Sequence, residues 1–199
     1  MTTSVIGRGI GTIAGMLVVW IVLGLVVLAG LYLMFLYNGL VRLRNRIEAA
    51  WAQIDVQLRR RYDLIPNLVE TVKGYATHER ETLDSVTRAR AAAESASGPA
   101  DQAKAENMLT QSLRSLFAVS EAYPDLKANQ NFLSLQEELS ATEGRIAYAR
   151  QYYNDTVQRY NTKIQSFPAV VLAGALRFQE REYFEADDES RGPVNVSFS

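Results

Sequence analysis

The chain has 199 residues, a formal net charge of −1, 48% hydrophobic residues, one histidine and no cysteine. The lack of cysteine excludes disulfides, a lipoprotein anchor and the usual His/Cys zinc site. The slightly acidic balance, without basic residues interleaved among aromatic ones, argues against a nucleic-acid partner. There is no P-loop, G-x-S-x-G or G-x-G-x-x-G motif, so we expect no enzyme: no catalytic residue, cofactor, metal or small-molecule substrate.

Residues 9–41 contain no charged side chain. A helix of this length is about 50 Å long, whereas a bilayer core needs only about 20 apolar residues. A cleaved signal peptide would be shorter and would end in small residues. A buried helix of a soluble protein rarely needs such a long apolar run. We therefore predict a transmembrane segment at 9–41, after a short leader at 1–8.

Basic residues follow this segment. Arg42, Arg44 and Arg46 come directly after it, whereas only Arg8 precedes it. The positive-inside rule then predicts a single-pass protein of the cell membrane, with the N-terminus outside and the remainder in the cytoplasm. We expect the three arginines to lie at the membrane interface with Tyr37. There they would favour anionic headgroups, or form an ordinary positive-inside flank.

Helical periodicity dominates the rest of the chain. Apolar residues recur every three or four positions from residue 47 onward, which predicts a helix over 38–75 that continues the membrane span as one rod; this stripe includes Ile47, Ile54, Leu58, Ile65 and Val72. Further helices are expected at 79–96, 100–122 and 125–166. Short connections make neighbouring helices antiparallel. The predicted fold is all-α: an N-terminal transmembrane helix continuing into a long antiparallel four-helix bundle over 42–178, with coiled-coil-like packing and a short C-terminal helix or loop.

The end of the chain holds an apolar and an acidic segment. Residues 169–178 (AVVLAGALRF) are too short to span a bilayer, so they either cover the membrane-proximal part of the bundle or lie in the membrane interface. Residues 179–191 carry six acidic side chains and two arginines. We expect 179–199 to form an acidic, flexible tail.

Two polar stripes run beside the apolar ones. Glu143, Arg150 and Asn154 share one face of the last long helix, and Asp63 and Asn67 share a face of the first. They are candidates for an inter-helix network that fixes register, for instance through Asp63 and Arg150. The alternatives are a solvated face of i,i+4 pairs, or a carboxylate cluster for a ligand or for catalysis.

Three segments carry a family resemblance: YNGLVRLRNRIEAAWAQIDVQLRRRYDLIPNLVETVKGYATHE, YPDLKANQNFLSLQEELSATEGRIAYARQYYNDTVQRYN and FPAVVLAGALRFQEREYFE. Together they cover nearly all of residues 36–186, which closely resemble the LemA family. The resemblance implies a membrane-anchored antiparallel helical bundle of the bacterial envelope, with no agreed activity and no catalytic motif to carry over.

The function expected from these features is a non-enzymatic scaffold or adaptor. It would act through other membrane proteins as partners, or through lateral self-assembly as a homo-oligomer. A bundle that remodels the lipid bilayer through residues 169–178 is the alternative.

Overall fold

The computed structural model describes residues 3–185, which are largely helical and contain no strand. The predicted all-α fold, with one long apolar N-terminal helix, is confirmed. Six helices follow one another in this part of the chain: α1 (Thr3–Lys73), α2 (Arg80–Ser95), α3 (Pro99–Ser120), α4 (Pro124–Lys127), α5 (Gln130–Gln165) and α6 (Ala169–Ala175).

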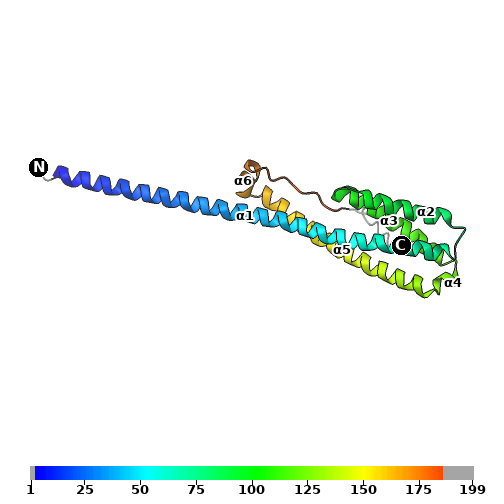
Figure 1. Ribbon diagram of the computed structural model, residues 1–199. Helices are drawn as coiled ribbons and strands as arrows, with labels where there is room; N and C mark the ends of the chain where they lie inside the picture. Colours follow the sequence, from blue (N-terminus) through cyan, green and yellow to red (C-terminus); the bar gives the residue numbers. More distant parts are fainter. Residues whose placement is uncertain (1–2, 186–199) are drawn as a thin grey trace, which may run out of the picture.

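Helix α1 is a continuous rod of 71 residues that passes through Pro66 without ending. At 1.5 Å per residue it is about 105 Å long, and roughly half of it extends beyond the other helices (Figure 1). The large apolar side chains from Met16 to Phe35 are exposed to the surroundings. Soluble proteins rarely expose apolar patches of this extent, and the helix is long and apolar enough to cross a membrane, which supports membrane anchoring. The predicted continuity between span and bundle is confirmed.

Helix α5 runs back along the second half of α1, and the two pack against each other over most of α5 (Figure 1). The predicted apolar stripe of α1 is buried in this contact and in the contact with α2 and α3. Helices α2 and α3 form a hairpin over the half of the pair that is distant from the span. The rings of Phe117 and Phe132, 6.2 Å apart between centroids, connect α3 to α5.

The last long helix begins later than the predicted residue 125. Its N-cap is Asn129, whose side chain accepts a hydrogen bond from the backbone N–H of Phe132 at 3.1 Å. This bond satisfies one of the backbone donors left free at a helix start. Residues 124–127 form the separate short helix α4. Asn129 also donates to the Tyr75 hydroxyl at 2.9 Å, which connects this turn to the end of α1.

Helix α6 packs on α1 and α5 near the middle of the rod (Figure 1). Ala169 and Ala173 are buried there, so residues 169–178 do cover the bundle. The chain turns at Leu176 and Arg177 and then continues as an extended segment; we call residues 176–185 the strap. It follows the α1–α5 pair toward the α2–α3 turn. The predicted flexible tail therefore differs from the structure over 179–185, and its remainder, 186–199, lies outside the described residues.

Candidate functional site

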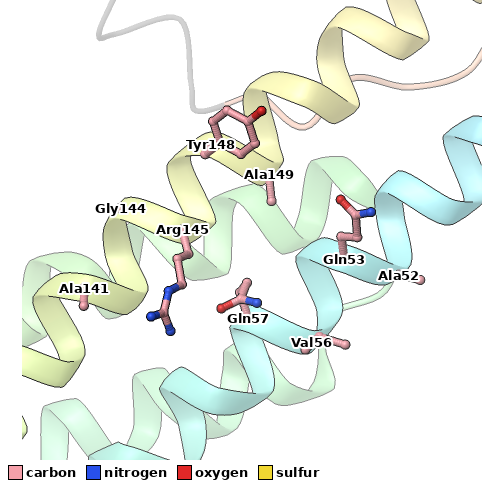
Figure 2. Close-up of a pocket in the computed structure, with 9 residues that line it drawn as sticks. All are labelled: Ala52, Gln53, Val56, Gln57, Ala141, Gly144, Arg145, Tyr148 and Ala149. Atoms are coloured by element: carbon pink, nitrogen blue, oxygen red, sulfur yellow. The ribbon is translucent and has the colours of Figure 1, made fainter.

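An apolar groove opens between α1 and α5 on the side away from the α2–α3 hairpin (Figure 2). Its volume is about 660 Å³. We call it the open groove, and its lining consists of Ala52, Gln53, Val56 and Gln57 from α1 with Ala141, Gly144, Arg145, Tyr148 and Ala149 from α5.

Small residues, alanine and glycine, form the base of the open groove, and the exposed side chains of Val56 and Tyr148 stand on either side of it. Val56 is 61% exposed and Tyr148 is 75% exposed. Gly144 carries no side chain and has free space where a Cβ would stand, so another helix could approach closely there. The side-chain oxygen Oε1 of Gln57 is buried yet accepts no hydrogen bond from any part of residues 3–185. The groove is therefore an apolar surface with one unsatisfied acceptor.

Buried polar side chains form a second feature, in the distal half of the bundle, which is the half that is distant from the span. We call it the polar network. Arg61 is nearly fully buried and donates to Glu106 at 3.0 Å and to Thr110 at 2.7 Å. Tyr62 donates its hydroxyl to Glu106. Gln102 donates to the Tyr62 hydroxyl at 2.9 Å and to Glu106 at 3.1 Å. The network joins α1 to α3 through a buried ion pair.

Tyr62 acts in this network as a neutral donor. Burial, reinforced by the hydrogen bond to Glu106, raises the pKa of Tyr62 well above its usual range. Both oxygens of Glu106 accept hydrogen bonds from its neighbours, and the side chain is nearly fully buried. This arrangement suits a structural role that fixes the register of α1 and α3.

The candidate residues of the predicted inter-helix network separate in the structure. Glu143 reaches the polar network, with an oxygen 3.3 Å from Arg61 Nη1. Arg150 places its guanidinium 4.7 Å from the centre of the Phe184 ring; burial lowers its pKa, an effect that Glu143 opposes. Asp63 and Asn67 are exposed on α1, away from the polar network.

Asn154 instead begins a ladder of hydrogen bonds to the strap. Its amide donates to the Phe184 carbonyl at 3.1 Å and accepts from the Phe184 N–H at 2.8 Å. Asn161 repeats this pattern with the backbone of Arg181, with both bonds at 2.9 Å. The preceding tyrosines donate their hydroxyls to strap carbonyls, Tyr153 at 2.9 Å and Tyr160 at 3.0 Å.

The ladder works because two repeats match in length. The Tyr-Asn pairs are seven residues apart on α5, which is about 10.5 Å along a helix axis. Their backbone partners are three residues apart on the strap, which is about 10 Å for an extended chain. Each Tyr-Asn pair therefore meets equivalent backbone groups. Burial raises the pKa of both tyrosines, which keeps them as donors.

The predicted membrane-interface residues surround the point where α1 enters the bundle. Arg42, Arg44 and Arg46 are all exposed. The ring of Tyr37 contacts that of Phe178 edge to face, with centroids 6.1 Å apart.

Sequence reasoning missed the polar network and the strap. Neither Arg61 nor Glu106 was among the candidate residues taken from the sequence. Glu106 does carry a sequence signal, because it stands four residues after Gln102 and three before Leu109 on the buried stripe of α3. A charged residue on an apolar stripe needs a buried partner.

Comparisons with known proteins give one family and several relatives. The LemA family model matches residues 50–198. Protein LemA of Metamycoplasma hominis is 27% identical over 164 residues, covering 80% of this chain and 74% of the relative. Magnetosome protein MamQ 2 of Paramagnetospirillum magneticum and Magnetosome protein MamQ of Magnetospirillum gryphiswaldense are each 24% identical over 188 residues, covering 81% of this chain and 69% of the relative.

Proposed function

This chain belongs to the LemA family, and we propose that it is a non-enzymatic, membrane-anchored scaffold that assembles laterally through its open groove. The occupant of the groove is a second copy of the same chain. The observation that carries the proposal is an exposed apolar surface, from Val56 to Tyr148, on a helix pair that is well packed on its other side.

The continuous rod supports the choice of a second copy. Val56 follows Leu36, the first buried residue of the bundle, by 20 residues, or about 30 Å of unbroken helix. Copies anchored in one membrane therefore present the open groove at the same height. Two identical faces at equal height meet readily about a two-fold axis, the commonest symmetry of homo-oligomers. In such a contact Tyr148 of each copy would lie over the small residues of the other.

The chemistry of the lining favours association over catalysis. Most of the groove is alanine, glycine, valine and amide side chains, and Arg145 is its one ionisable group apart from the Tyr148 phenol. A catalytic site needs several titratable groups that converge. We place the bundle in the cytoplasm because Arg42, Arg44 and Arg46 follow the span.

Photo-crosslinking in native membranes tests this proposal. A photoreactive phenylalanine analogue replaces Tyr148 in the full-length chain, and a matched control carries it at Asp84, an exposed position on α2. Two copies that carry different affinity tags are co-expressed, so that purification through both tags isolates crosslinks between copies for mass spectrometry. We expect the analogue at Tyr148 to yield such crosslinks to residues 52–57 or 141–149. Equal yields from both positions, or adducts with other proteins alone, would overturn the second-copy assignment.

A further inference from the structure

Helix α6 lies at the depth where the membrane span ends. Helix α6 packs on α1, and the ring of Tyr37 contacts that of Phe178 shortly after α6. Tyr37 is inside the uncharged run at 9–41. Because α1 is continuous, the part of α1 that meets α6 borders the bilayer.

The outward face of this region is apolar. Phe167 is 84% exposed and Val171 is 68% exposed, and Val170 and Leu176 are also exposed. The opposite face of α6 packs on the bundle through Ala169 and Ala173. At this depth, the outward face of α6 can be covered by the bilayer, at the boundary between headgroups and acyl chains.

A basic pocket of about 170 Å³ lies beside this apolar face. Its charged lining is Arg44 from α1 with Arg177, Glu180 and Arg181 from the strap, and Tyr160, Phe178 and Gln179 complete it. The volume is below the roughly 300 Å³ at which sites for whole small molecules begin. It suits a single compact group such as a phosphate.

The charges of the pocket are incompletely balanced. Arg44 and Arg177 form no ion pair with any of residues 3–185. Arg181 has one partner, Glu48, at 3.7 Å. Glu180 accepts a hydrogen bond from Gln165 at 2.7 Å. Three guanidinium groups therefore border one cavity with a single carboxylate, and guanidinium groups suit the bidentate recognition of phosphate oxygens.

The depth of Arg44 fits a lipid headgroup. Arg44 stands three residues after Val41, the last residue of the uncharged run, so it lies about 4.5 Å further along the helix. Because the uncharged run is about 50 Å long and the hydrocarbon core only about 30 Å, Arg44 lies in the headgroup layer, about 5 to 7 Å thick, when the core covers the C-terminal part of the run. We propose that Arg44, Arg177 and Arg181 bind the phosphate of an anionic lipid headgroup, while Phe167 and Val171 enter the adjacent acyl boundary. The site is separate from the open groove, so each proposal can fail without the other.

Native mass spectrometry of the full-length protein tests the site. The protein is released from detergent micelles that contain equal amounts of phosphatidylglycerol and phosphatidylcholine, and retained lipids are counted. The double variant Arg44→Gln/Arg177→Gln removes two pocket charges. The matched control Arg42→Gln/Arg46→Gln removes two exposed charges of the same helix, one turn or less from Arg44, that do not line the pocket.

We expect the wild type to retain phosphatidylglycerol in preference to phosphatidylcholine. The pocket variant should retain about tenfold less of the anionic lipid, because charge-assisted contacts are lost, while the control keeps it. Equal loss in both double variants would show that lipid retention depends on the basic residues after the span in general, and not on the pocket. This result would overturn the proposal. Displacement of the lipid by millimolar inorganic phosphate would show that the pocket binds a free anion in place of a lipid headgroup, and would overturn the assignment to lipid.

The depth of α6 has its own test in lipid nanodiscs. A nitroxide at Val171→Cys should relax faster with oxygen, which enriches in the bilayer, than with a water-soluble nickel complex. The same label at Asp84→Cys should show the reverse. Relaxation of the Val171 label by the nickel complex alone would place α6 in water and overturn the proposal.

Discussion

The α1–α5 pair is covered in two different ways along its length. Over the distal half, the α2–α3 hairpin adds a third layer and places the charged pair Arg61–Glu106 in the interior. Over the membrane-proximal half, the strap adds a single extended segment, which neutral side chains bind through its backbone, as Asn154 and Asn161 do. One half depends on complementary charges and the other on matched repeat lengths.

This difference teaches where the molecule is vulnerable. A buried ion pair contributes little net stability, but loss of one partner leaves an uncompensated charge in the interior. An amide that binds backbone contributes about 1 kcal/mol for each hydrogen bond, and the strap stays partly hydrated when a bond is lost. We therefore expect global unfolding from damage to the distal half and local detachment from damage to the proximal half.

The largest effect should come from Arg61→Ala. This change leaves Glu106 buried without its cation, which costs about 3–5 kcal/mol of the free energy of unfolding. Chemical unfolding of the full-length protein in detergent, followed by circular dichroism, measures it. The control Arg59→Ala removes the exposed pair with Asp55 and should cost less than about 1 kcal/mol. Similar losses in the two variants would contradict a buried charge in the distal half.

The double change Asn154→Ala/Asn161→Ala should act on the proximal half. Four hydrogen bonds to the strap are lost, and we expect detachment of the strap while α1 and α5 remain helical. Limited trypsin digestion should cut faster after Arg177 and Arg181, with little change in the circular dichroism of the helices. The control Asn131→Ala, at an exposed position on α5, should digest like the wild type. Unchanged cleavage in the double variant would show that the ladder does not hold the strap.

A smaller effect is expected from Tyr62→Phe at neutral pH, about 1 kcal/mol for each of the two lost hydrogen bonds, with Glu106 and with Gln102. The pH dependence is more specific. Because the folded protein raises the pKa of Tyr62 above 10.0, the contribution of this hydroxyl is complete below pH 10 and is lost as the pH rises above it. The wild type should therefore lose stability more steeply above pH 10 than Tyr62→Phe does. Parallel curves would contradict a buried neutral phenol.

Sequence periodicity predicted the helices because apolar spacing is a local property. Ile54, Leu58 and Ile65 are buried as their stripe predicted, and the uncharged run at 9–41 indicated the anchor. The start of α5 was missed because one side chain, Asn129, caps that helix from within a polar segment.

The features that sequence could not supply are long-range pairings. Arg61 and Glu106 are 45 residues apart. The spacing of Arg61, three residues after Leu58 and four before Ile65, places it on the buried stripe of α1, but does not show that Glu106 is its partner. The strap was read as a tail because its acidic side chains suggest solvent, whereas its contacts with α5 are made largely by backbone groups. The second Tyr-Asn pair, seven residues after the first, is the signal that points to the ladder.

Cysteine labelling can decide whether the open groove is covered in the membrane. The chain has no cysteine of its own, so Tyr148→Cys and the control Asp84→Cys each provide one thiol for maleimide. We predict that the Tyr148 position labels several-fold more slowly in native membranes than in dilute detergent, where copies separate, while the Asp84 position labels equally in both. Equal labelling of the Tyr148 position in membranes and in detergent would contradict assembly through the open groove.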